Sequence, residues 1–180
     1  MKITVLIFMV LLTALSLPVT ANNTWLDAQG HPAAESDSSK SIDGFSGMLL
    51  VTPDQDWADK WNTSPETVPH FSSANEVVDG NTLFMLTFFA GAGRDSTGKT
   101  NVLCDFSMIR PDGSKSIEQA DAPCFQVELE EDSNSTFMAP AVVGYLAEPT
   151  DQRGTWTFRM TLKDKVRGVE LPLKASFLVK

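Results

Sequence analysis

The chain has 180 residues, a formal net charge of −9 and an isoelectric point near 4.6. This acidic balance, with no run of basic residues to offset it, argues against nucleic acid or anionic lipid as a partner. We interpret the charge as a soluble surface. Without an N-terminal leader, the remaining length suits one domain with one hydrophobic core.

The first 21 residues have the pattern of a secretory signal peptide. Lys2 supplies a positive charge, Ile3 to Leu17 is an almost unbroken apolar run, and Val19-Thr20-Ala21 is a cleavage site. Pro18 ends the run before the roughly 20 residues that a membrane-spanning helix needs. We expect cleavage after Ala21, export to the periplasm or the medium, and a mature protein without stable membrane insertion.

Residues 22–46 are predicted to form a flexible N-terminal arm, and residues 47–180 the folded domain. The arm is rich in Ser, Asp, Ala and Asn, lacks periodicity, and carries one tryptophan, Trp25. The domain begins with the apolar run Met48-Leu49-Leu50-Val51, which is typical of a strand.

The run Thr52-Pro53-Asp54-Gln55 has the pattern of an N-cap, a first-turn proline and a capping box. It predicts a short helix near residues 53–61. Such a helix brings Trp57 and Trp61, four residues apart, onto one face. That face either packs as core or forms an aromatic platform for a sugar or a peptide.

From Thr82 onward the apolar residues recur with period two, which indicates strands. The clearest case is Thr155 to Lys163, where alternate residues are large and apolar. The other expected strands are Leu83 to Ala90, apolar on both faces as in a central strand; Val102 to Met108; Phe125 to Glu130, with Phe125, Val127 and Leu129 inward; Ala141 to Leu146; and a last one with Leu173, Ala175, Phe177 and Val179. About seven short strands separated by Gly, Pro and Asp turns predict an all-β, immunoglobulin-like two-sheet antiparallel sandwich.

Two stretches carry a resemblance to a known kind of protein. Glu148-Pro149 followed by Gly154-x-Trp156-x-Phe158 and Leu162-x-Asp164 resembles the penultimate strand of bacterial exported immunoglobulin-like modules. Gly47 to Phe71, with Lys60-Trp61-Asn62 and Val68-Pro69-His70, is similar to uncharacterised bacterial periplasmic proteins of that kind. The resemblance implies a fold and no catalytic residue.

Cys104 and Cys124 are the two cysteines of the chain, and an oxidising compartment predicts that they form a disulfide. A closed loop of about twenty residues stabilises a fold by roughly 3 kcal/mol. A redox pair would favour a Cys-x-x-Cys spacing, which is absent. The two cysteines are also too close in sequence to join the B and F strands of an antibody domain.

The segment Gly93 to Thr100 matches the phosphate-loop pattern of a glycine, four residues and Gly-Lys-Thr. A nucleotide site needs a helix directly after Lys99, but Asn101 to Ile109 alternate as a strand. An exported protein also meets little ATP. We therefore predict a glycine-rich hairpin loop over Gly91 to Thr100, with no nucleotide bound by Gly93, Gly98, Lys99 and Thr100.

The chain offers few groups for catalysis or metal binding. Its two histidines, His31 and His70, have no triad motif and no metal-ligand spacing around them. The acidic residues Glu128, Glu130, Glu131 and Asp132 are interpreted as a solvated face, and Met48, Met85, Met108, Met138 and Met160 as core filling rather than soft-metal ligands. We expect no catalytic residue, no metal, no cofactor and no enzymatic activity.

The sequence therefore predicts an exported, non-enzymatic cell-envelope module that acts through protein-protein or structural interaction with an envelope protein. The candidate binding surface consists of Trp57, Trp61 and His70, with Trp25 on the arm. The alternative is a small-ligand binding protein for a carbohydrate or a metal ion. A hydrolase would need acidic or histidine groups converging in a cleft, which the spacing does not show.

Overall fold

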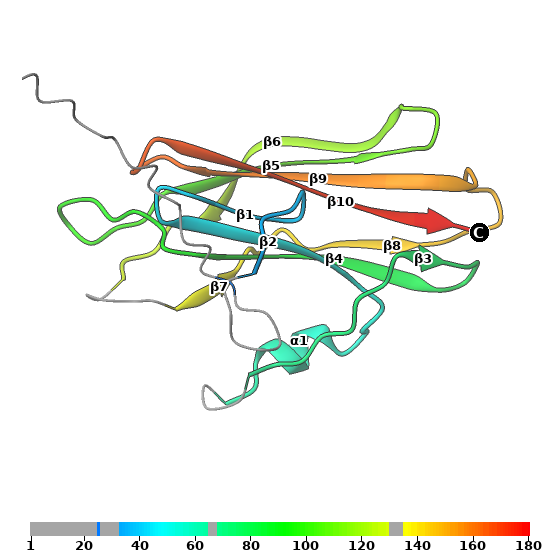
Figure 1. Ribbon diagram of the computed structural model, residues 1–180, viewed down its shortest axis with the longest axis horizontal. Coiled ribbons are helices and arrows are strands. Elements are labelled where there is room, and N and C mark those ends of the chain that lie inside the picture. Colours follow the sequence, from blue (N-terminus) through cyan, green and yellow to red (C-terminus); the bar gives the residue numbers. More distant parts are fainter. Residues whose placement is uncertain (1–24, 26–32, 65–67, 130–134) are drawn as a thin grey trace, which may run out of the picture.

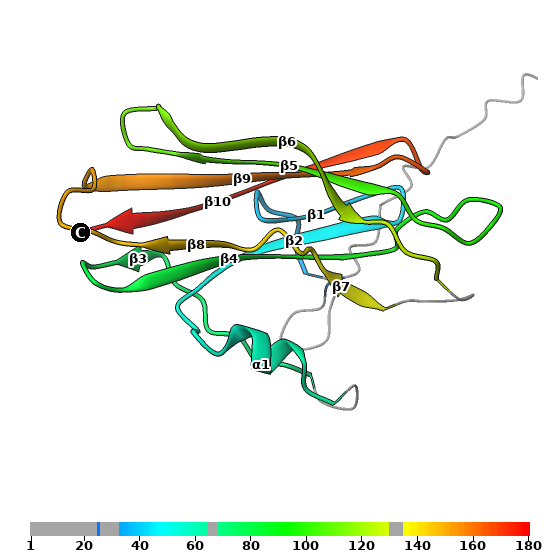
Figure 2. The same ribbon diagram turned by 180° about the vertical axis from the view of Figure 1, so that it is seen from behind.

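The computed structural model describes residue 25 and residues 33–64, 68–129 and 135–180. The predicted signal peptide and most of the predicted arm lie outside the described residues. The described part is all-β, with two sheets packed face to face and one short helix, α1 (Trp57–Trp61). Figure 1 shows the two layers, and Figure 2 shows them from behind.

The first sheet, called here the β2–β4 sheet, contains β1 (Ser39–Ile42), β2 (Phe45–Thr52), β4 (Thr82–Ala90), β7 (Thr136–Met138) and β8 (Val143–Leu146). Both β7 and β8 pair with β4. The second sheet, the β9–β10 sheet, has the order β3 (Glu76–Val77), β10 (Val169–Val179), β9 (Gly154–Asp164), β5 (Val102–Ile109) and β6 (Lys115–Phe125). The strand pairs are antiparallel except β3 with β10, which is parallel.

The core lies between the two sheets. Trp156, Phe158, Met160 and Leu162 of β9 are all buried, as their alternation predicts. Gly47 of β2 lies opposite them, and a Cβ there would come within 2.5 Å of Leu171 Cδ2. The glycine therefore allows the sheets to approach closely, and its neighbours Met48 and Leu50 face away from the core.

The all-β sandwich with one short helix is confirmed, but three local predictions need correction. The strand predicted over Phe125 to Glu130 is wrong, since β6 ends at Phe125 and residues 126–129 form only a bridge between Lys99 and Glu128. Val127 is 41% exposed rather than inward. β6 itself carries exposed side chains over most of its length and has no apolar alternation to reveal it.

The helix begins at Trp57, later than the capping pattern predicts. Asp56 occupies the N-cap position without a side-chain cap. Thr52 instead accepts a hydrogen bond from the Asp54 backbone N–H at 3.1 Å, so it closes a local turn around Pro53. The Thr52 hydroxyl is therefore used in this turn and does not cap the helix.

The sheet begins before the predicted boundary at residue 47. β1 and the start of β2 form a hairpin whose turn is Asp43-Gly44, both with positive φ (49° and 78°). This is the backbone geometry that two-residue hairpins prefer. Phe45, directly after the turn, is fully buried. The polar composition of β1 therefore conceals an edge strand within the segment predicted to be an arm.

The predicted disulfide between Cys104 and Cys124 is confirmed, with their Cα atoms 5.6 Å apart. It links β5 to the edge strand β6 within one sheet. The immunoglobulin-like strand arrangement stays a prediction. The helix of the described residues, α1, is too short to cross a membrane.

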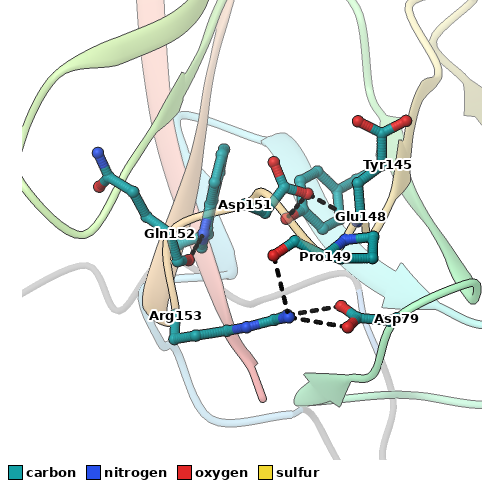
Figure 3. A network of polar contacts seen from close by, with 8 residues as sticks. Asp79, Tyr145, Glu148, Pro149, Asp151, Gln152 and Arg153 are labelled. Carbon is teal, nitrogen blue, oxygen red and sulfur yellow. Dashed lines mark hydrogen bonds and ion pairs between the residues drawn. The ribbon is translucent and has the colours of Figure 1, made fainter.

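A polar network closes one end of the sandwich (Figure 3). The Tyr145 hydroxyl donates to Asp151 Oδ2 at 2.8 Å, and the Glu148 backbone N–H donates to the same oxygen at 2.9 Å. Arg153 forms a two-fold contact with Asp79, at 2.6 and 2.8 Å. The two parallel hydrogen bonds between Arg153 and Asp79 hold the β8–β9 connection against the turn before β4.

Candidate functional site

The outer face of the β2–β4 sheet is apolar, unlike the solvated outer face that a two-layer sandwich usually has. In the sheet register Phe88 of β4 lies opposite both Met48 of β2 and Met138 of β7. Directly opposed residues share a face, so the three side chains form one row. Phe88 is only 3% exposed, although it faces away from the core. Something must therefore cover it.

The helix α1 and residues 68–73 cover it, and we call these two segments together the roof. α1 lies on the side of the β2–β4 sheet that faces away from the β9–β10 sheet (Figures 1 and 2). Trp57 packs on Phe84 with ring centroids 6.2 Å apart, and Trp61 packs on Phe88 at 5.4 Å. Phe71 contacts Phe88 from the roof at 5.5 Å. Tilted aromatic pairs at these distances stabilise a fold beyond their buried area.

Asp54 attaches the roof to the end of β2. Its Oδ2 accepts hydrogen bonds from Lys60 Nζ and from the Ser72 backbone N–H, both at 2.8 Å. Lys60 also contacts Asp56 at 3.2 Å. The hydrogen bond from Lys60 lowers the pKa of Asp54 to about 2, against the opposing effect of burial and with help from Ser72. The carboxylate is therefore charged at neutral pH and holds helix and loop together.

The roof leaves an open pocket of about 430 Å³ on the sheet, called here the aromatic pocket. It is lined by Trp25, Met48, Leu50, Trp61, Val68, Pro69, His70, Phe71, Phe88 and Thr136. Val68, on the roof, is 91% exposed. A solvent-exposed apolar side chain next to an apolar pocket is typical of a binding site.

Three of the four candidate residues from the sequence meet in this pocket. Trp61 and His70 line it from the roof, and Trp25 joins them from the segment before β1. Trp57 does not line it and packs on Phe84 instead. Both helix tryptophans are half-buried, so Trp57 is a packing residue, whereas Trp61 both packs and faces the pocket.

Sequence reasoning missed the floor of the site, formed by Phe88, Leu50 and Met48. One signal was available. The stretch Leu83 to Ala90 is apolar on both faces, and a central strand of a two-layer sandwich has only one face in the core. Its second apolar face therefore required a cover, and the nearby tryptophan helix was the available element.

In the segment that matches the phosphate-loop pattern, backbone N–H groups donate hydrogen bonds to carboxylates of the protein itself. The Gly93 N–H donates to Asp164 Oδ2 at 2.6 Å. Asp95 Oδ1 accepts from the Thr97 N–H at 2.8 Å and from the Lys99 N–H at 3.1 Å. These are the amides that would face a phosphate in a nucleotide site. The segment after Thr100 is the strand β5, as predicted, where a phosphate loop requires a helix.

Residues 33–64, 68–129 and 135–180, with residue 25, contain no group of three His, Cys, Asp or Glu side chains placed to hold a metal ion. Met85, Met108 and Met160 are buried in the core, where they fill space as predicted. Met48 differs from these three because it lines the aromatic pocket.

The chain matches no known family model, and no curated protein matches it. Among solved structures, it is similar over 74% of its length to a family 123 glycoside hydrolase from Clostridium perfringens (TM-score 0.40, 10% identity, 27% of that chain). It is also similar over 76% to the alkylpurine DNA glycosylase AlkC of Pseudomonas fluorescens (0.41, 10%, 30% of that chain). A Niemann-Pick type C2 protein from Japanese carpenter ant is similar over 73% (0.32, 9%, 89% of that chain).

The chain spans less than a third of the first two of these proteins. At identities of 10% or below and TM-scores under 0.5, the three likenesses carry no argument about function. The function has to be argued from the site itself.

Proposed function

We propose that the protein is an exported, non-enzymatic binding module of the cell envelope that holds a protein partner through the aromatic pocket. The observation that carries this proposal is an open apolar pocket of about 430 Å³ with the 91% exposed Val68 beside it. Ligand pockets occupy about 300–1,000 Å³, so this pocket is large enough for one or two side chains.

The pocket's lining indicates the chemistry of the partner. Among the residues that the structure describes, those lining the pocket include no carboxylate, lysine or arginine, so this lining favours an uncharged group. Aromatic rings and an adaptable methionine suit a bulky apolar or aromatic side chain. We infer that the partner contributes such a side chain from a segment that also contacts Val68.

Export is part of the proposal and rests on two features. The signal-peptide pattern predicts it, and the disulfide between Cys104 and Cys124 is the kind of bond that persists outside the cytoplasm. An exported module meets little ATP, which agrees with a loop whose amides already bind Asp95 and Asp164.

A small-ligand role is the second candidate, and the pocket makes a carbohydrate the weaker version of it. Sugar sites combine an open aromatic face with several polar groups. Within the described part of the chain, the polar side chains that line the pocket are those of His70 and Thr136, apart from the indole of the tryptophans. The Trp61 ring is packed on Phe88. A panel of sugars in a thermal-shift assay tests this version, because a ligand of the native state raises its melting temperature.

A photo-crosslinking side chain at position 68, in intact cells, tests the protein-partner proposal. The matched control is position 146, because Leu146 is another exposed apolar residue (51%) and does not line the pocket. We expect a defined protein adduct at position 68 that disappears with Trp61→Ala and persists with Trp57→Ala. The same adducts at both positions, or none at position 68, would contradict the proposal.

A further inference from the structure

An opening in the side of the sandwich lies where the edges of the two sheets come together, and we call it the side window. It has a volume of about 410 Å³ and is lined by residues 49–51 of β2 and residues 174–176 of β10. Two short segments, residues 36–38 and 73–74, border it. Of its described lining, the side window shares only Leu50 with the aromatic pocket.

The edge of β10 leaves one main-chain group unbound at the side window. Alternate N–H groups of a strand point to the same side. On this side of β10, the Lys174 N–H donates to the Asp37 C=O at 2.7 Å, and the Leu178 N–H donates to the Asn75 C=O at 2.9 Å. Ser176 lies between them with the same orientation, and no acceptor within the described residues binds its N–H. The edge of β10 can therefore bind a main-chain acceptor at Ser176.

The edge of β2 has the same kind of gap. The Leu49 N–H donates to the Ser38 C=O at 2.8 Å, and the Ala74 N–H donates to the Val51 C=O at 2.9 Å. Between these two contacts, the Leu49 C=O and the Val51 N–H face the same edge, and neither has a backbone partner there among the described residues. Unbound strand edges are the surfaces to which a partner adds an extended segment.

The side window also opens onto the core. Alternate residues of β10 face inward, and of these Leu173 and Phe177 are 2% and 1% exposed. Ala175 lies between them on the same face but is only half-buried. Its small side chain lines the window together with Leu49 and Val51. An apolar side chain that enters the window therefore meets apolar surface over Ala175.

We propose that the side window binds an extended peptide segment of a protein partner, which pairs with β10 at Ser176 and places one apolar side chain over Ala175. In this mode main-chain hydrogen bonds give affinity, and the side-chain pocket gives specificity. Positions 174 and 178 lie about 13 Å apart along a strand, so about two to three residues fit between the contacts already made there. The site is a second contact surface and does not depend on the aromatic pocket.

Ser176→Pro tests the main-chain contact, because proline removes the N–H and is tolerated at the edge of a sheet. β10 already contains Pro172, whose position has the same orientation as Ser176. Ser176→Ala is the matched control. Both variants lose the hydroxyl that lies 2.9 Å from the Thr157 hydroxyl, but only alanine keeps the N–H. Ala175→Leu fills the space that the partner's apolar side chain would occupy.

The probe is a display library of random heptapeptides, selected on the purified mature protein. We expect enriched peptides that bind Ser176→Ala as tightly as the parent chain. They should bind Ser176→Pro and Ala175→Leu at least about fivefold more weakly, because an unpaired hydrogen-bonding group or a blocked contact remains. In the parent chain the Ser176 amide should exchange faster than the amides of Lys174 and Leu178, and a bound peptide should protect it. Thermal unfolding verifies that each variant folds, and the exchange measurement on the parent chain needs no variant.

Three results would overturn the site: no enriched peptide, equal binding by Ser176→Pro and Ser176→Ala, or a Ser176 amide that a bound peptide does not protect. Peptides that lose binding with Trp61→Ala and keep it with Ser176→Pro bind the aromatic pocket. If these alone are enriched, the side window is refuted while the proposed function is supported. The two proposals can therefore fail separately.

Discussion

The Asp54 carboxylate lies 2.8 Å from the Ser72 backbone nitrogen and joins the end of β2 to the far side of the roof. The same oxygen binds the Lys60 ammonium group at 2.8 Å. Helix, loop and strand thus meet at one side chain that is 9% exposed. We expect the position of Trp61 and Phe71 over Phe88 to depend on this contact, because it joins the roof to the end of β2.

Asp54→Asn should loosen the roof in a pH-dependent way. The pKa of Asp54 lies at about 2, below its ordinary value of 3.8, chiefly through the hydrogen bond from Lys60. A lowered folded pKa gives stability that is present above about pH 4 and lost as pH falls through about 2. We expect the variant to lose about 1–2 kcal/mol of unfolding free energy at neutral pH.

Urea unfolding of the parent chain and the variant at pH 7, pH 4 and pH 2 measures this loss. The difference between them should shrink at the lowest pH. Asp56→Asn is the control, since Asp56 also contacts Lys60 but is 60% exposed. An equal loss for both variants would show that the roof does not depend on Asp54.

Alanine variants of the two helix tryptophans should distinguish an effect on stability from an effect on partner binding. Trp57→Ala and Trp61→Ala each remove an aromatic pair with β4 and should each cost about 1–3 kcal/mol by loss of buried apolar area. Only Trp61→Ala also removes a wall of the pocket. Denaturation midpoints combined with crosslinking from position 68 test this, and partner loss with Trp57→Ala alone would contradict it.

Removal of the disulfide should release the edge of one sheet. Cys104 and Cys124 are 20 residues apart, and closure of a loop of that length stabilises by roughly 3 kcal/mol. Both are buried, so Cys104→Ala/Cys124→Ala preserves the packing better than polar replacements. We expect hydrogen exchange to increase first in β6, which stands at the end of the described strand order and pairs with β5. Unchanged β6 exchange in the double variant would refute this account.

Asp164→Asn should free the glycine loop. The buried Asp164 carboxylate accepts the Gly93 N–H at 2.6 Å and the backbone N–H groups of Val166 and Arg167 at 3.0 Å. An amide offers one accepting oxygen where the carboxylate offers two, so at least one buried donor loses its partner at a cost of about 1–3 kcal/mol. Calorimetry measures the loss, and exchange of the Gly93 amide locates it. Parent-like protection of the Gly93, Val166 and Arg167 amides together in the variant would show that the Asp164 carboxylate does not hold the loop.

Strands with one buried face were predictable from sequence, and strands without one were not. In β9 the core imposes alternation from Trp156 to Leu162, so composition and geometry agree. β6 is an edge strand with mostly exposed side chains, and nothing apolar marks it. The residues that do alternate, around Val127, lie just beyond its end. Pattern reasoning therefore placed the strand several residues too late.

The site was predictable only in part. Trp61 and His70 were named because large aromatic and ionisable residues stand out in a sequence. Phe88 and Met48 were not, because an apolar residue in a strand is ordinarily core. Their role depends on the sheet register, which places them on the face opposite the core, and register is set by the whole fold rather than by local sequence.

Tyr145 offers a direct test of the network at the end of the sandwich, because it is the single tyrosine of the chain. Its ring packs between Trp156 and Phe177, with centroids 4.9 and 5.0 Å away, and its hydroxyl binds Asp151. Burial and the hydrogen bond to Asp151 both raise the pKa of Tyr145 above its ordinary value of 10.0. A raised folded pKa means that stability falls as pH increases above 10.

Near-ultraviolet absorbance of the tyrosinate reports this pKa without interference from a second tyrosine. We expect the folded chain to ionise well above pH 10 and the urea-unfolded chain near it. Asp151→Asn should move the folded midpoint down toward the unfolded one, because the charge that opposes ionisation is gone. Tyr145→Phe should cost about 1 kcal/mol, the net worth of one hydrogen bond, and should remove the signal. A folded midpoint at the unfolded value would show that the Tyr145 hydroxyl does not bind Asp151.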